Sequence, residues 1–239
     1  MSLRNKKVLI AGIRNNIGTA TAYFVLKEGG TACISSKTES NLIKVKAMLS
    51  PYGKIEYVTG DVNTYEKAVE VVNRCAKLLG GIDNLVVGYS GIIEDSIESP
   101  RGLNDMVQLH LSNPINVIRA SLNYLGSGST IVILLSIQGV DRPSPEKMSY
   151  SLVMAGLSKL VEILAQELMY REIRVVGLAH GDVDETFIPD REWKNLRKLG
   201  SPSAPPEDYA KIITWLLDED SVWINGTVIL ADGGFRLRR

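Results

Sequence analysis

Residues 7–18 read KVLIAGIRNNIG, a short apolar run that passes through a glycine-containing turn into a helical pattern. Glycine permits positive φ and lets another group approach the backbone closely, and the free N–H groups at the start of a helix attract phosphate. A strand, a turn and a helix in this order predict a nucleotide-binding loop. Its candidate binding residues are Gly12, Arg14, Asn16, Ile17 and Gly18.

Strand-like and helix-like patterns alternate along the rest of the chain. The strand patterns cover 7–11, 31–35, 55–59, 84–88, 130–135, 174–178 and 227–230. The helical patterns cover 17–28, 40–49, 64–79, 101–124, 149–170 and 206–217. This alternation predicts an α/β fold, a single Rossmann-type domain over residues 1–239 with a doubly wound, seven-stranded parallel sheet of order 3-2-1-4-5-6-7. Asn113-Pro114 is expected to kink or break its helix.

Composition excludes several classes of protein. Lysine plus arginine and aspartate plus glutamate number 27 each, a balance that argues against a nucleic-acid partner. Unbroken apolar runs such as Ile131–Leu135 are far shorter than the roughly 20 residues of a membrane span, so no membrane partner is expected. Cys33 and Cys75 lack the spacing of a metal site and are expected to be buried thiols of a cytoplasmic protein.

Four motifs farther along the chain share one order and spacing. Residues 150–157 and 165–168 read YSLVMAGL and AQEL, and Ser136 precedes them by about fourteen residues. Residues 173–181 read IRVVGLAHG, and INGT at 224–227 is followed by DGG at 232–234. With the turn at residues 11–18, these motifs resemble the short-chain dehydrogenase/reductase family over nearly the whole chain. The corresponding family patterns are TGxxxGxG, YSxSKAALxxL, IRVNxVAPG and ITGxxxxVDGG.

The resemblance implies hydride transfer between a nicotinamide cofactor and a small carbonyl or alcohol. Tyr150 would be the general acid/base and Ser136 would hold the substrate oxygen. The remaining cofactor contacts would come from Gly88, Gly181 and Val183. The long helices over 101–124 and 149–170 pair family members, so a homodimer or homotetramer is expected.

The end of the second strand favours NADP over NAD. NAD-binding relatives carry an acid at the position of Ser36, whereas Ser36 and Lys37 can accept a 2′-phosphate, with Arg14 assisting. The alternative is that these are solvated surface residues. Asp61 and Val62 match the pair beside the adenine, although Asp61 also suits an ordinary turn or helix cap.

Five departures from the family gather around the cofactor. Met154 replaces the lysine that lowers the tyrosine pKa, His110 replaces a relay asparagine, Asn16 replaces a loop glycine, and His180 replaces a proline. The family's NNAG segment reads VGYSG at 87–91. Asn16 is expected to adopt the left-handed conformation that asparagine tolerates. His110 is either a catalytic proton relay or a helix histidine satisfied by a backbone carbonyl, and the role of His180 stays open.

These departures leave two functional hypotheses. The first is an NADP-preferring oxidoreductase, and the second is a degenerate relative that binds a nucleotide or a partner without redox turnover. Neither Lys147 nor Lys159 is placed to replace the missing cation. The irregular segment 182–203 occupies the place of the family's substrate lid. Its basic residues would either close over an anionic substrate or form an ordinary surface helix; these are Arg191, Lys194, Arg197 and Lys198.

Overall fold

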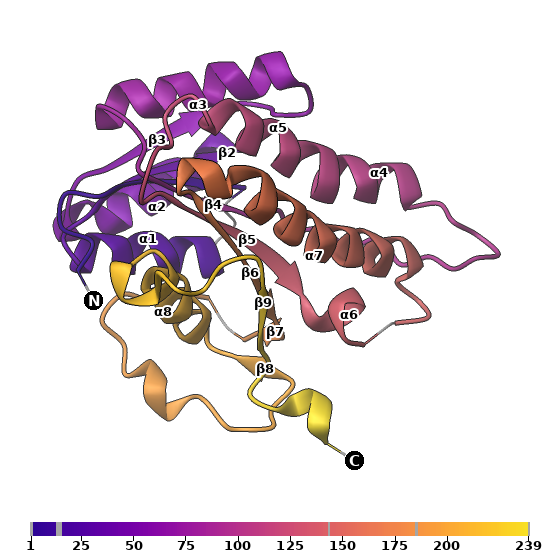
Figure 1. Cartoon of the computed structure of the whole chain (residues 1–239). Coiled ribbons are helices and arrows are strands. Elements are labelled where there is room, and N and C mark those ends of the chain that lie inside the picture. Colours follow the sequence, from indigo (N-terminus) through magenta and orange to yellow (C-terminus); the bar gives the residue numbers. More distant parts are fainter. Residues whose placement is uncertain (1, 13–15, 143, 185, 239) are drawn as a thin grey trace.

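The computed structural model describes residues 2–12, 16–142, 144–184 and 186–238. A seven-stranded sheet runs through the centre of the molecule, with every strand pair parallel and the order β3-β2-β1-β4-β5-β6-β9 (Figure 1). This confirms the predicted sheet. Its strands are β1 Lys7–Ala11, β2 Thr31–Ser36, β3 Ile55–Thr59, β4 Asn84–Val87, β5 Thr130–Ser136, β6 Arg174–His180 and β9 Val228–Ala231.

Helices cover both faces of the sheet. The α-helices are α1 Ile17–Lys27, α2 Glu39–Leu49, α3 Tyr65–Leu79, α4 Leu103–Val107, α5 Asn113–Ser121, α6 Ile137–Val140, α7 Met148–Leu168 and α8 Pro206–Leu216. One apolar cluster joins the sheet to α3, α5 and α7, and a second joins it to α1, α2 and α8. Because side chains of a strand alternate between faces, Leu9 enters the first cluster while Val8 and Ile10 enter the second. Burial on both faces explains the continuous apolar strand patterns.

Asn113-Pro114 neither kinks nor breaks its helix, which corrects the expectation. α4 passes into the π-helical segment Gln108–Ser112 and then into α5, and the residues at both joints keep helical φ and ψ. Figure 1 shows α4 and α5 as one continuous run. Proline lacks the N–H that an α-helix needs, and the wider π-helical turn before Pro114 accommodates that loss. The segment also turns the side chain of His110 into the core.

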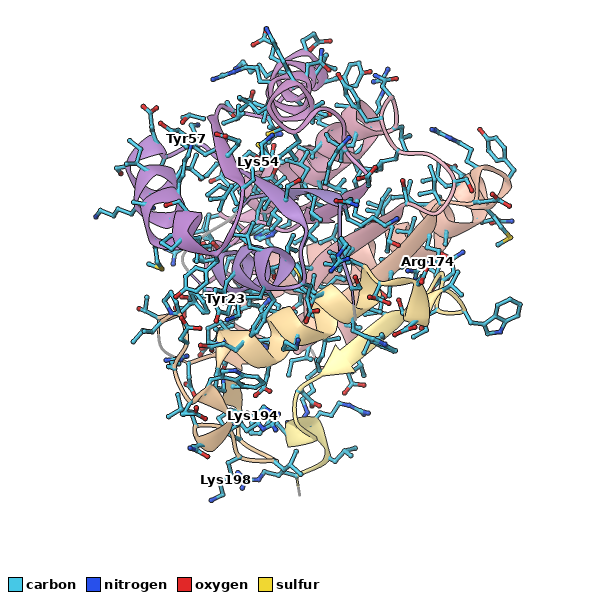
Figure 2. All side chains as sticks on the ribbon, turned by 90° about the vertical axis from the view of Figure 1, so that its left-hand side faces the viewer. Tyr23, Lys54, Tyr57, Arg174, Lys194 and Lys198 are labelled. Carbon is cyan, nitrogen blue, oxygen red and sulfur yellow. The ribbon has the colours of Figure 1, made fainter. Side chains whose placement is uncertain are left out.

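A buried arginine fixes the far edge of the sheet. Arg174, at the start of β6, donates from its guanidinium to the carbonyl oxygens of Leu216, Asp218, Ser221 and Ile224. Figure 2 shows Arg174 beside the sheet, near the C-terminal end of α8. A charged group is costly to bury unless its donors are satisfied, so these carbonyls hold Arg174 and Arg174 in turn orders the chain between α8 and β9.

The helix that carries Tyr150 is long and apolar. By length and composition alone, Met148–Arg171 would suffice to cross a membrane. Its apolar residues are interrupted by polar ones, so it contains no long unbroken apolar run. Its inner face is packed in the first apolar cluster, where Val153, Leu157 and Val161 are buried. Packing accounts for the apolar side chains of this inner face, whereas Leu152 and Ile163 on the same helix are exposed.

Candidate active site

Two adjoining cavities lie at the carboxyl ends of the parallel strands. The first cavity, of about 350 Å³, is lined by residues that include Ser36, Lys37, Asp61 and Val62. The second cavity, of about 330 Å³, is lined by residues that include Asn16, Ile17, Gly18, Gly88, Tyr150, Met154, His180 and Val183. Gly12, Tyr89 and Ser90 line both. Most of the predicted cofactor residues therefore share one groove.

Three predicted site residues lie outside both cavities, and the position of a fourth is not described. Ser136, His110 and Gly181 are outside the lining of both cavities in the described part of the chain, and Arg14 falls outside the described residues. Ser136 and His110 nevertheless lie close to Tyr150, as set out below. A Cβ at Gly181 would come within 3.0 Å of the Pro202 carbonyl oxygen, so the glycine there serves a close approach of two backbone segments.

Gly12 makes the closest approach in the loop. Its φ is +83°, and a Cβ at this position would lie 2.3 Å from the carbonyl oxygen of Gly88. Its N–H donates to the Ser35 carbonyl, which ties the loop to β2. Only glycine fits such a position. Asn16, in contrast, has φ −113° and ψ −102°, so the expected left-handed conformation at Asn16 is wrong.

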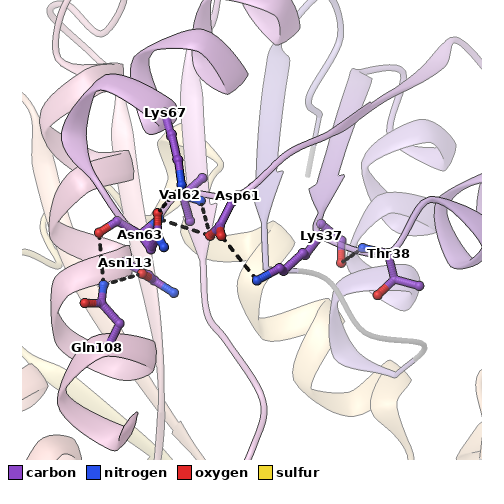
Figure 3. A network of polar contacts seen from close by, with 9 residues as sticks. Lys37, Thr38, Asp61, Val62, Asn63, Lys67, Gln108 and Asn113 are labelled. Carbon is purple, nitrogen blue, oxygen red and sulfur yellow. Dashed lines mark hydrogen bonds and ion pairs between the residues drawn. The ribbon is translucent and has the colours of Figure 1, made fainter. Parts of the chain in front are cut away.

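Lys37 and Asp61 face each other across the first cavity (Figure 3). Lys37 Nζ lies 3.2 Å from Asp61 Oδ2, and Asp61 Oδ1 accepts from the backbone N–H groups of Val62 and Asn63. Burial raises the pKa of Asp61, but Lys37 and these N–H groups together lower it by more, so the net shift is downward. Asp61 thus has the turn role that the sequence offered as the alternative to contacting adenine, and it also lines the cavity.

Tyr150 and Ser136 meet beside the second cavity. Tyr150 is buried at the start of α7, and Ser136 ends β5. Burial raises the pKa of Tyr150, a hydrogen-bonding interaction with the Ser136 side chain opposes the rise, and the charge of Asp182 adds to it. The balance lies above the ordinary value for tyrosine. Asp182 was not singled out in the sequence, because no motif marks it.

Met154 lies one turn after Tyr150 on α7 and is 2% exposed. Its Sδ accepts from the backbone N–H of Ser136 at 3.3 Å. The two lysines nearest in sequence are engaged elsewhere. Lys147 donates to Gln138 Oε1, and Lys159 pairs with Glu162 at the surface. The position where the family has the lysine that lowers the tyrosine pKa is therefore occupied by a neutral thioether.

His110 packs edge-on against Tyr150, with ring centroids 5.3 Å apart and an interplanar angle of 81°. Its Nε2 lies 2.8 Å from the Gly91 carbonyl oxygen. Burial lowers the pKa of His110, and the Gly91 contact opposes this. A neutral imidazole that donates from Nε2 keeps only Nδ1 as an acceptor. This contact matches the alternative of a histidine satisfied by a backbone carbonyl.

His180 ends β6 beside the second cavity. Its Nδ1 lies 2.6 Å from the Gly181 carbonyl oxygen, and its ring contacts that of Tyr209. Burial lowers the pKa of His180, while the Gly181 contact and Asp182 oppose the shift. The imidazole is therefore a neutral wall of the cavity. Among the described residues, no group of three or more His, Cys, Asp or Glu side chains is arranged to hold a metal ion.

Asp95 positions the N-terminus of α7. Its Oδ1 accepts from the backbone N–H of Ser149, and its Oδ2 accepts from the Ser149 hydroxyl at 2.5 Å and from the N–H of Gly102. The hydroxyl and N–H of Ser149 lower the pKa of this carboxyl group. A carboxylate at a helix N-terminus satisfies free N–H groups there. Because Asp95 lies far from α7 in the sequence, no local capping pattern predicts this contact.

The segment expected to form a lid begins beside Tyr150 and then docks against α1 and α8. It contains strand β7 Asp182–Val183, which pairs with β8 Ser203–Ala204, and one 3₁₀ turn at Trp193–Asn195. Arg191 forms two hydrogen bonds to the Glu207 carboxylate on α8, and Arg197 pairs with Asp208. In the described part of this segment only Val183 lines the second cavity. Where the basic helical pattern was predicted, the structure has the 3₁₀ turn Trp193–Asn195.

An aromatic anchor explains where the segment goes. Asp190 accepts hydrogen bonds from the hydroxyl groups of Tyr23 and Tyr52, and Phe187 is buried against Tyr23. Trp193 contacts Phe24 on α1. Figure 2 places Tyr23 above this segment, with Lys194 and Lys198 at its outer edge. These contacts join residues far apart in sequence, so periodicity does not reveal them.

Comparisons with known proteins agree over almost the entire chain. The family model described as enoyl-(acyl carrier protein) reductase matches residues 12–236. Human dehydrogenase/reductase SDR family member 4 is 30% identical over 97% of this chain and 88% of its own length. A 3-oxoacyl-[acyl-carrier-protein] reductase from Thermotoga maritima is 28% identical over 98% of this chain and 99% of its own.

Solved structures share the fold. A short-chain dehydrogenase from Burkholderia cenocepacia, in complex with NADP, has a TM-score of 0.85 at 22% identity, covering 99% of this chain and 100% of its own. A short-chain oxidoreductase from Pseudomonas aeruginosa, described as containing an atypical catalytic center, has a TM-score of 0.88 at 21% identity, and both chains are covered completely.

Proposed function

Because the chain belongs to the short-chain dehydrogenase/reductase family of NAD(P)-dependent oxidoreductases, we propose that it reduces a small carbonyl compound with NADPH. The observation that carries the proposal is the meeting of Tyr150 and Ser136 beside a cavity of about 330 Å³ at the carboxyl end of the sheet. A phenol and a hydroxyl in this arrangement can both contact one substrate oxygen.

The residues of the groove fit a dinucleotide at its adenosine end. Gly12 allows the cofactor to approach the backbone closely. The first cavity is lined by Ser36 and Lys37, and Ser36 stands where NAD-binding relatives carry an acid. Lys37 is exposed and its ion pair with Asp61 is on the surface, so a 2′-phosphate can draw the ammonium toward itself at small cost. The NADP complex of the Burkholderia cenocepacia relative supports this assignment. When bound, the cofactor supplies the hydride.

Tyr150 provides the proton. Since its pKa is raised, the phenol stays protonated at neutral pH and can donate to the carbonyl oxygen that receives the hydride on its carbon. In this proposal the Ser136 hydroxyl, which interacts with Tyr150, holds the same oxygen. Met154 contributes no charge to stabilise a phenolate. The site is thus better suited to reduction than to the reverse oxidation, which requires the deprotonated tyrosine.

Association of two or four copies belongs to the same proposal. α4, α5 and α7 expose apolar side chains that a partner would cover, namely Leu103, Val107, Ile115, Leu152 and Ile163. Light scattering on the purified protein tests this, and a monomer would contradict it. A cytoplasmic location is likewise proposed, supported by Cys33 and Cys75, which are free and buried.

Direct titration with NADPH and NADH, followed by a screen of carbonyl compounds for loss of nicotinamide absorbance, tests the proposed function. We expect tighter binding of NADPH and measurable turnover. Tighter binding of NADH would contradict the NADP preference. Binding without turnover of any carbonyl compound would favour the alternative of a relative that binds nucleotide without redox chemistry.

A further inference from the structure

Tyr89 lies where the two cavities meet. Together with Gly12 and Ser90 it lines both of them. Its ring lies against Gly12, since a Cβ at Gly12 would lie 2.8 Å from Tyr89 Cδ1. The aromatic ring therefore covers the glycine that allows the closest approach to the backbone of this loop.

A dinucleotide must pass this point to reach both ends of the groove. Asp61 lies in the first cavity and Tyr150 in the second, and the cavities join at Gly12. The start of α1, which offers free N–H groups to phosphate, adjoins the same junction. The ring of Tyr89 borders both cavities at this junction.

Few interactions hold the ring in place. The Tyr89 hydroxyl makes no hydrogen bond to any described residue, and the side chain is only partly buried against the first apolar cluster. Burial and the charge of Asp61 raise the pKa of Tyr89, so the phenol is neutral and forms no ion pair. Among the described residues, rotation away from Gly12 therefore disrupts packing contacts and no hydrogen bond of the Tyr89 hydroxyl.

We propose that Tyr89 is a gate in the dinucleotide groove: its ring closes the junction in the free protein and must turn away from Gly12 before a dinucleotide can occupy both cavities. This inference rests on the proposed function. A binding-competent state that is only partly populated weakens the observed affinity by the populated fraction. Tyr89 therefore lowers the affinity for a whole dinucleotide but not for a fragment confined to the first cavity.

Calorimetric titration of wild type, Tyr89→Ala and Tyr89→Phe with NADPH, NADH and adenosine 2′,5′-bisphosphate tests the gate. We expect Tyr89→Ala to bind NADPH at least about tenfold more tightly than wild type. Tyr89→Phe, which retains the ring, should match wild type. The bisphosphate should show no such gain, because it lacks the nicotinamide half that must pass the junction to enter the second cavity.

Unchanged or weaker binding of both dinucleotides to Tyr89→Ala would overturn the gate, and weaker binding would show instead that the ring stacks on the ligand. If both dinucleotides gain equally in Tyr89→Ala but NADH binds more tightly than NADPH, the gate stands and the NADP preference fails. A gain for only one of them would overturn the gate, because opening favours both alike. Stopped-flow binding to wild type gives a test without a variant. Opening before binding makes the observed rate level off as NADPH concentration rises, and a linear increase contradicts it.

Discussion

The backbone N–H of Ser136 donates to the thioether sulfur of Met154 across 3.3 Å. This contact joins the end of β5 to the helix that carries Tyr150, and it fills the position where the family places a lysine. The side chain that would lower the tyrosine pKa has become part of the packing that holds the substrate-side serine.

Replacing Met154 with lysine should restore a cation beside Tyr150. An ammonium group near the phenol stabilises the phenolate, and general acid–base catalysis is worth about 10²–10⁴-fold, so we expect at least a tenfold faster oxidation of an alcohol substrate. Initial rates of NADP reduction measure the change. Met154→Leu is the matched control, since it keeps the volume but adds no charge and should leave the rate near wild type. A folded, NADPH-binding Met154→Lys protein with no gain in rate would contradict the assignment.

The pH dependence should differ between the two directions of the reaction. Burial, with Asp182 adding to it, keeps the pKa of Tyr150 above its ordinary value of about 10. Carbonyl reduction uses the protonated phenol and should vary little between about pH 6 and 9. Alcohol oxidation uses the phenolate, so its rate should climb about tenfold per pH unit without a plateau. Steady-state rates across this range decide, and a plateau of the oxidation rate near neutrality would show that the pKa is not raised.

Gly12 and Gly128 form a matched pair for testing the close approach in the loop. Both have positive φ, +83° and +80°, but a Cβ at Gly128 would meet nothing within 4 Å. Each substitution by alanine costs about 1 kcal/mol for the left-handed backbone. Gly12→Ala should cost more, because its Cβ would collide with the Gly88 carbonyl. Urea unfolding measures the difference, and equal losses of stability would mean that the loop relaxes freely.

The strands were predictable because a strand that is buried on both faces consists of consecutive apolar residues. Lys7–Ala11 and Ile55–Thr59 match their predicted bounds, and α3 ends at Gly80 in the left-handed conformation, as its glycines indicated. The helix with Pro114 was harder, since a π-helical segment leaves no periodic signal that distinguishes it from a kink.

The site was predictable only where a motif marks it. Tyr150, Ser136 and most of the groove followed from spacing. The capping of α7 by Asp95 and the docking of Asp190 on Tyr23 depend on contacts between distant segments. Such contacts follow from the folded arrangement rather than from local composition, so the sequence did not indicate where the segment 182–203 docks.

Arg174 should be among the most sensitive positions for stability. Arg174→Met leaves several buried carbonyl oxygens without a donor, and we expect the free energy of unfolding to fall by about 3 kcal/mol. Arg174→Lys keeps the charge and some donors and should lose less. Arg4→Met, at an exposed position, serves as the control and should match wild type. Guanidinium chloride denaturation compares the four proteins, and a neutral Arg174→Met would contradict the role given to this side chain.

The most direct test of the proposed activity compares wild type with Tyr150→Phe on one carbonyl substrate found in the screen. The measurement is the initial rate of NADPH consumption at saturating cofactor, with NADPH binding checked for both proteins. The account predicts that Tyr150→Phe binds NADPH as wild type does and loses at least about a hundredfold in rate, because the proton donor is gone. An unchanged rate in Tyr150→Phe would contradict it.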